Sequence, residues 1–252
     1  MAQNLDLSDF LTPKLISILE YKNIRIIKRE DLLFLIKKYT NSKNPNKLIK
    51  NLKYQKKLLT IKREYYLYVP VASIDKTPSI SEFEINEVYL DFNDLYYIGL
   101  INAYHLHGFT TQIPNKLFVF NTKYNLEKKI FNFKIKYIKI PKDKFFGIYN
   151  KKYPFSDIEK TIIDVLNYFK YVDSLDTIIN QIKKKKHLFN ENKLINYAKK
   201  EGSVKILKLI GVITDNQKLF LYLKNNNKLN YYTKIRNTKL NKRYNKWKIA
   251  LI

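Results

Sequence analysis

The stretch from residue 12 to residue 71 constrains this chain most, because its helix and strand signals follow one specific order. The pattern predicts helix, short strand, helix, helix and hairpin over residues 12–21, 24–27, 29–40, 44–57 and 58–71. Thr12-Pro13 and Asn44-Pro45 each pair a preferred N-cap residue with a proline suited to the first helical turn. This order is typical of a winged helix-turn-helix, whose third helix enters the major groove and whose hairpin forms the wing.

The third predicted helix is amphipathic in a way that suits nucleic acid. Leu48, Ile49 and Leu52 share one side at helical spacing, and the opposite side carries lysines. From residue 43 to residue 63 the sequence has eight basic residues and no acid. We therefore predict DNA contacts by Lys43, Asn46, Lys47, Lys50, Asn51, Lys53, Tyr54, Lys57, Lys62 and Arg63. Lysines would contact phosphates, and Asn46 or Asn51 would pair with adenine edges.

Charge is large and unevenly distributed. The 252 residues carry a formal net charge of +26, which favours a polyanionic partner such as DNA, RNA or an anionic membrane surface. Residues 76–120 are net acidic, and their start is rich in serine with one proline. We therefore predict an α+β protein with a winged helix-turn-helix in residues 1–75, a linker in 76–92 and a larger α+β domain in 93–252.

The lengths of the apolar runs and the lack of cysteine limit which other classes of protein and site are possible. No apolar run reaches the ~20 residues that cross a bilayer, and the first ten residues lack a basic region typical of a signal peptide. The chain has no cysteine, which excludes disulfides, thiolate zinc sites and cysteine nucleophiles. We expect a cytoplasmic protein with no membrane partner.

Two histidines, His105 and His107, are the first candidates for chemistry. We expect a helix from Asn93 or Asp94 to His107, ended by Gly108 in the left-handed conformation. Side chains two residues apart on a helix diverge by about 200°, so the pair cannot share a metal ion. We expect one of them to pack under the following loop with a backbone partner.

Three other patterns invite catalytic interpretations, and each has a simpler one. Ser156-x-x-Glu159 is a capping box before an apolar helix, in which Asp164 is exposed or paired with Lys160. Glu127-x-Lys129 has nuclease-like spacing but no preceding strand aspartate. The Gly-Ser at residues 202–203 lacks the Asp-x-Asp of a nucleotidyltransferase. We predict no catalytic residue, no metal ligand and no cofactor.

The C-terminal part has basic residues of its own. Residues 133–141 alternate apolar and basic, as a half-exposed strand does. A possible second basic face consists of Lys134, Lys136, Lys139, Lys242 and Arg243. Tyrosines near the end of the chain can stack on nucleobases, whereas Trp247 with Ile249 and Leu251 is more typical of a packed final strand.

Several motifs together resemble one known family. "YYIGLINAYHLHGFTTQIPNKLFVF" (96–120) resembles the segment that marks AbiEi-family antitoxins of type IV toxin–antitoxin systems. The residues standing in the family's pattern are Ala103, His105, His107, Gly108, Thr111, Gln112, Ile113 and Pro114. Further matches follow in order: "IPKDKFFGI" (140–148), "SDIEKTIIDVL" (156–166), "NYAKKEG" (196–202) and "YNKWKIALI" (244–252). "NYFKYVDSLD" (167–176) departs from the family's Cys- or Gly-rich stretch, and residues 213–243 are hard to align.

The resemblance implies a DNA-binding autorepressor that binds inverted repeats ahead of its own operon. It also implies neutralisation of a nucleotidyltransferase-like toxin, a role in which the C-terminal domain takes part, with or without stable contact. Two alternatives stay open: an RNA- or toxin-binding module that does not read DNA sequence, and a nuclease-like enzyme.

Overall fold

The structure is a computed structural model that describes residues 7–40, 42–72, 80–90, 94–236 and 241–252. It is a mixed α+β protein, as the sequence predicts. The chain forms two compact units, residues 1–93 and 94–252, and each is described by itself. Pro78 and Ser79, which suggested a linker, lie outside the described residues.

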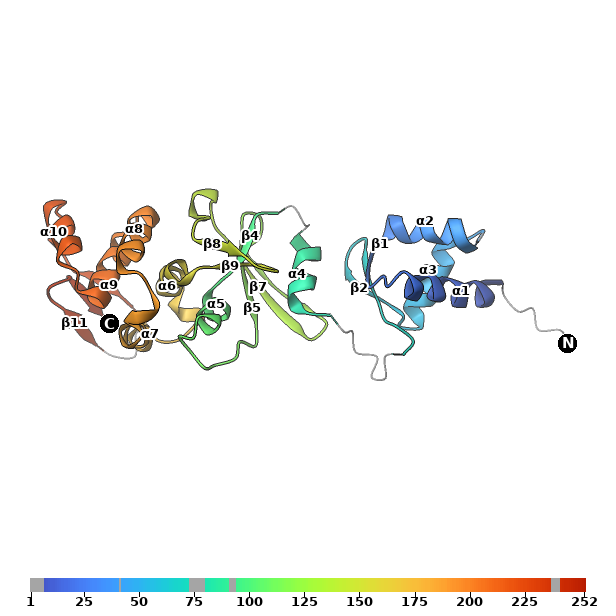
Figure 1. Ribbon diagram of the computed structural model, residues 1–252, viewed down its shortest axis with the longest axis horizontal. Helices are drawn as coiled ribbons and strands as arrows, with labels where there is room; N and C mark the ends of the chain where they lie inside the picture. The colour runs from blue at the N-terminus through green and yellow to red at the C-terminus, as the bar shows by residue number, and fades with distance from the viewer. Residues whose placement is uncertain (1–6, 41, 73–79, 91–93, 237–240) are drawn as a thin grey trace. The chain divides into compact units, whose positions relative to one another are not determined.

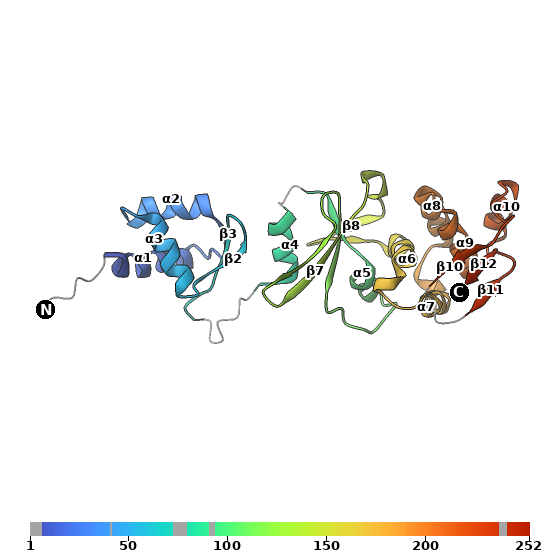
Figure 2. The same cartoon turned by 180° about the vertical axis from the view of Figure 1, so that it is seen from behind.

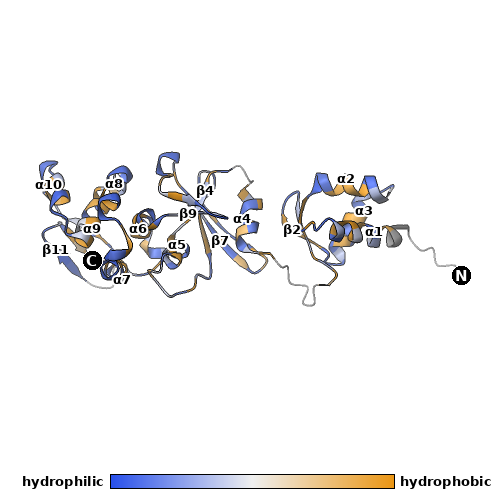
Figure 3. Cartoon of the chain, in the orientation of Figure 1, coloured by the Kyte–Doolittle hydropathy of each residue, from blue (hydrophilic) through white to orange (hydrophobic). Residues whose placement is uncertain are grey.

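The first unit has the element order of a winged helix (Figure 1). Its elements are α1 (Leu7–Tyr21), β1 (Ile26–Lys28), α2 (Arg29–Thr40), α3 (Pro45–Tyr54), β2 (Leu58–Lys62), β3 (Tyr65–Tyr68) and α4 (Glu82–Leu90). The strands form one antiparallel sheet in the order β1-β3-β2. Helices α1, α2 and α3 pack on one another around buried leucines and isoleucines. Polar and apolar residues alternate along these helices (Figure 3).

Two helix boundaries differ from the sequence prediction. The first helix begins at Leu7, so Pro13 lies inside it, and Thr12 is buried in the helix and not its N-cap. The third helix ends at Tyr54, because the chain turns at Gln55 and Lys56 has a positive φ of 56°. Its start is as predicted: the Asn44 side chain accepts a hydrogen bond from the Lys47 amide at 3.1 Å.

The segment predicted as a linker contains a helix, α4. Ser81 and Glu84 form a reciprocal capping box, with the Ser81 amide donating to Glu84 Oε2 at 2.9 Å and the Glu84 amide donating to Ser81 Oγ at 3.3 Å. The serine that suggested a loop is thus a helix cap. α4 packs against β2, and the Lys62 ammonium donates to the Tyr89 carbonyl at 3.4 Å.

The second unit is built on a six-stranded mixed sheet in the order β6-β7-β5-β4-β9-β8. Its strands are β4 (Tyr96–Ile98), β5 (Leu117–Asn121), β6 (Leu126–Ile130), β7 (Phe133–Lys139), β8 (Ile148–Asn150) and β9 (Pro154–Ser156). A second sheet, in the order β10-β12-β11, is formed by β10 (Thr233–Ile235), β11 (Lys242–Tyr244) and β12 (Ile249–Leu251). The final strand and a buried Trp247 match the prediction.

In the described residues of this unit, six α-helices cover its core (Figures 1 and 2). They are α5 (Leu100–Leu106), α6 (Ile158–Asn167), α7 (Leu175–Lys184), α8 (Glu191–Glu201), α9 (Val204–Thr214) and α10 (Gln217–Asn225). The last four begin at Ser174, Asn190, Ser203 and Asn216, whose side chains each accept a backbone amide hydrogen bond. No helix in the described ranges combines the length and the apolar character needed to cross a bilayer.

The histidine segment corrects one prediction. Residues 96–98 were expected to be helical, but they form β4, paired with β5 and β9. Only Leu100–Leu106 is helical, and Gly108 follows with the expected positive φ of 74°. The aromatic residues at 96 and 97 favour a strand, and their pairing partners come from segments more than fifteen residues away.

The N-cap of α6 also differs from the expected capping box. Asp157, not Ser156, accepts the hydrogen bond from the Lys160 amide, at 2.8 Å. Ser156 Oγ instead lies 2.7 Å from Thr161 Oγ1. Glu159 reaches α8, where it accepts from the Asn190 amide at 2.8 Å.

The packing of α9 generates a test of the fold. A Cβ at Gly211 would lie 2.1 Å from Cε3 of the buried Trp247. We expect Gly211→Ala to lower the free energy of unfolding by about 1–3 kcal/mol or more, as overpacked cores do. The matched control is Gly108→Ala, where a Cβ meets nothing within 4 Å and only the left-handed backbone is strained. That strain costs about 1–2 kcal/mol. Equal tryptophan-monitored urea midpoints for Gly211→Ala and the unaltered chain would contradict this packing.

Candidate nucleic-acid interface

The orientation of α3 is fixed by its apolar side. Leu48, Ile49 and Leu52 are 1%, 5% and 0% exposed, and they pack in the core shared with α1, α2 and β2. The other side of the helix therefore faces solvent. The exposed residues on this side and in the turn before the helix, together called the α3 basic face, are Lys43, Asn46, Lys47, Lys50, Lys53 and Tyr54. Tyr54 is 89% exposed, although a tyrosine ring is costly to leave in water.

The β2–β3 hairpin adds cations beside this helix. Lys28 and Lys62 are both register partners of Tyr65, on either side of the central strand. Their ammonium groups lie 5.5 Å and 4.6 Å from the centroid of the Tyr65 ring. Arg63, at the turn, has a side chain that is 96% exposed. The sheet thus carries two lysines on one aromatic ring and, at its tip, an exposed arginine whose Nε lies 4.0 Å from the Glu64 carboxylate.

Arg29 was not singled out from the sequence, yet it joins three parts of the unit. Its amide donates to the Glu64 carbonyl at 2.8 Å, and its Nη2 donates to Asn46 Oδ1 at 2.7 Å. The first residue of α2 is therefore tied to the hairpin turn and to the start of α3. A cation at a helix N-terminus opposes the helix dipole, which was the one available sequence signal. The exposed acids Glu30 and Asp31 follow it and limit anion approach at that end.

The contact of Arg29 changes the expectation for Asn46. An arginine side chain only donates hydrogen bonds, so the Asn46 atom facing it is the amide oxygen. Asn46 Nδ2 is then the group that remains to face outward. An amide oxygen has two lone pairs and Arg29 uses one of them, so the bidentate contact with adenine, which needs both an acceptor and a donor, would have to share this oxygen with Arg29.

The remaining predicted contacts are less exposed. Asn51, Lys57 and Lys62 are half-buried, and Lys62 also donates to the Tyr89 carbonyl. Lys57 lies after the end of α3, at the base of the hairpin. The Lys53 ammonium lies 4.7 Å from the centroid of the buried Tyr66 ring, toward the sheet. The exposed centre of the interface is therefore Lys47, Lys50 and Tyr54.

The residues of the possible second basic face do not lie together in the structure. Lys134, Lys136 and Lys139 belong to β7 in the six-stranded sheet, and alternation along a strand turns Lys139 to the other side from the first two. Lys242 and Arg243 belong to β11 in the other sheet. β7 and β11 lie at opposite ends of the second unit (Figures 1 and 2). The five residues do not form one surface.

The two histidines take different positions. His107 Nε2 donates to the Ser156 carbonyl at 2.8 Å, which confirms the expected backbone partner. His105 Nδ1 is buried and has no hydrogen-bond partner among the described residues. Within the described part of the chain, no group of three or more His, Asp and Glu side chains is placed to hold a metal ion.

Helix α6 carries a buried ion pair. Lys160 and Asp164 pair at 2.8 Å with side chains only 2% and 3% exposed, and the Tyr97 hydroxyl donates to Asp164 at 3.0 Å. Burial raises the pKa of Asp164, and the contacts from Lys160 and Tyr97 oppose that effect. Because the pair is enclosed and mutually satisfied, it connects α6 to β4, and no substrate can reach it without rearrangement.

Glu127, the acid of the nuclease-like spacing, lies on β6. It forms an ion pair with Lys116 at 2.6 Å, and Lys136 is its register partner on β7. The lysine contact lowers the pKa of Glu127. Its neighbours on the sheet are thus lysines, and its role here is charge pairing across an edge strand.

Comparison with known proteins shows the fold alone. No protein-family model matches the chain, and neither does any curated protein. The crystal structure of the RV2827C protein from Mycobacterium tuberculosis is similar, with a TM-score of 0.69 and 10% sequence identity. The match covers 96% of this chain and 91% of that one. At that identity the likeness establishes a shared architecture across nearly the whole of both chains.

Proposed function

We propose that the first unit binds duplex DNA in a sequence-specific manner, with α3 in the major groove and the β2–β3 turn on the adjacent backbone. The observation that carries the proposal is the α3 basic face, which is exposed because the opposite side of the helix is buried. Lys47 and Lys50 would contact phosphates, and Arg63 would reach the backbone or the minor groove beside the wing.

We further propose that the chain is an autorepressor and antitoxin of a type IV toxin–antitoxin system, acting in the cytoplasm. The motifs between residues 96 and 252 that resemble the AbiEi family support this part. Coexpression tests it separately: a nucleotidyltransferase-like partner encoded beside this chain should arrest growth alone and not in its company.

The central experiment removes two cations from the groove-facing helix. We first select a tightly bound duplex from a pool of random sequences. We expect Lys47→Ala with Lys50→Ala to weaken binding to this selected duplex several-fold or more. We also expect the slope of log K against log salt to become shallower by about two, one for each lost phosphate contact. Both side chains are exposed, so the circular dichroism spectrum should be that of the unaltered fold.

The matched control is Lys14→Ala with Lys22→Ala, which removes the same charge from exposed positions at α1. We expect that variant to change affinity and salt slope much less. Equal losses in the two double variants would mean that binding follows net charge alone. Unchanged binding by the α3 variant would contradict the groove assignment, and equal affinity for selected and scrambled duplexes would contradict sequence-specific recognition.

The Arg29–Asn46 contact predicts which bases are read. With one lone pair of its oxygen held by Arg29, Asn46 presents its amide donors more readily than its acceptor, and donors suit acceptors in the major groove such as guanine N7 and O6. We expect Arg29→Met to free Asn46 and to alter the base preference at one position more than the affinity for the rest of the site. Selection from random duplexes, followed by sequencing, measures this. An identical preference in both proteins would show that the contact does not govern recognition.

A further inference from the structure

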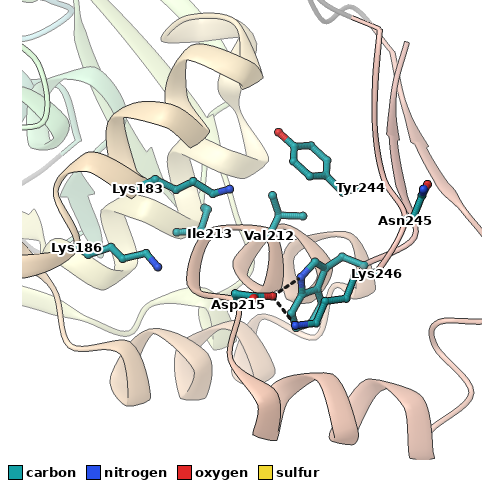
Figure 4. A pocket seen from close by; sticks show the side chains of 9 residues that line it. Lys183, Lys186, Val212, Ile213, Asp215, Tyr244, Asn245 and Lys246 are labelled. Carbon is teal, nitrogen blue, oxygen red and sulfur yellow. Dashed lines mark hydrogen bonds and ion pairs between the residues drawn. The ribbon is translucent and has the colours of Figure 1, made fainter.

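The second unit contains a cavity of about 660 Å³ that the DNA-binding proposal does not use. It lies where three element ends meet: the end of α7, the end of α9 and the turn between β11 and β12 (Figure 4). Its volume is within the range of about 300–1,000 Å³ typical of small-molecule sites. The cavity is widely open to solvent and has an apolar floor at Val212 and Ile213.

The charges around the cavity are unbalanced. Three lysines and one carboxylate line it, which leaves a formal excess of two positive charges. The carboxylate, Asp215, is already engaged: it accepts from the Lys246 ammonium at 2.7 Å and from Trp247 Nε1 at 3.2 Å. The other two lysines, Lys183 and Lys186, direct their ammonium groups into the cavity (Figure 4).

Within the described residues, one of these two lysines hydrogen-bonds a backbone carbonyl at a helix end, and the other does not. The Lys186 ammonium lies 3.5 Å from the Thr214 carbonyl, so it satisfies a carbonyl at the end of α9. The Lys183 ammonium lies 5.7 Å from the centroid of the Tyr244 ring, which a second cation, Lys242, approaches to 5.1 Å from β11. Burial, Lys242 and Lys186 together lower the pKa of Lys183, and the Asp215 carboxylate opposes them only in part.

We propose that this cavity binds a nucleoside phosphate. The phosphate would contact Lys183 and Lys186, and the nucleoside would lie against Val212 and the Tyr244 ring. An inorganic anion alone would leave most of the volume and the apolar floor unused. A free nucleotide and the phosphorylated end of a nucleic acid share this chemistry, and the experiment separates them.

Equilibrium dialysis with ATP tests occupancy at physiological ionic strength, ~0.15 M. The chain has a single tryptophan, Trp247, and it lines the cavity, so its fluorescence locates the bound ligand. We expect one ATP per chain, a saturable fluorescence change and weaker binding of inorganic triphosphate. Lys183→Gln should weaken ATP binding about tenfold or more, because it removes one charge-assisted contact. Lys184→Gln is the matched control, since Lys184 is exposed on the same helix and does not line the cavity.

Two further ligands identify the source of the phosphate. A short 5′-phosphorylated oligonucleotide that binds more tightly than ATP, and loses this advantage without its phosphate, assigns the site to a nucleic-acid end. The reverse order assigns it to a free nucleotide. The proposal is overturned if neither ligand binds saturably, if Lys183→Gln binds as well as the unaltered chain, or if inorganic triphosphate binds as tightly as ATP.

Discussion

Burial of three aliphatic side chains on α3 determines what the first unit presents to solvent. Each of Leu48, Ile49 and Leu52 contributes roughly 1.5–3 kcal/mol by leaving water. Rotating the helix by half a turn would expose all three and force lysines into the core, where an unpaired charge is far more costly. The cationic surface is therefore a consequence of the core. The hairpin then packs on the same core through Leu58 and Tyr66, which places the wing beside the helix.

Periodicity along the sequence predicted this unit well because its signals are local. The bounds of α2, the start of α3 at Asn44-Pro45 and the hairpin follow from caps, turns and apolar spacing. Two of the misses depend on contacts distant in sequence. β4 is a strand because β5 and β9 pair with it, and the role of Arg29 exists only once the hairpin turn and α3 come together. The helix α4 was not predicted, because its capping residue Ser81 lies in an acidic, serine-containing segment that also suggests a loop.

Net charge is a poorer guide in the second unit, where several lysines serve the fold. Lys160 pairs with Asp164 in the core. Lys208 is fully buried and donates to the Tyr231 carbonyl at 2.8 Å and to Thr233 Oγ1 at 3.0 Å. Other lysines are separated between two sheets. A high lysine content therefore does not by itself define a nucleic-acid surface. What distinguishes α3, and the cavity near Lys183, is that lysines outnumber carboxylates there.

Proximity of α3 to base pairs is the central claim, and the absence of cysteine from the chain allows a direct measurement of it. A single cysteine introduced as Tyr54→Cys, carrying a tethered iron chelate, should cleave a duplex that the chain binds tightly close to one position in the bound site. The same chelate on Lys14→Cys, on α1, should cleave weakly or not at all. Equal or diffuse cleavage from the two positions would contradict insertion of α3 into the groove.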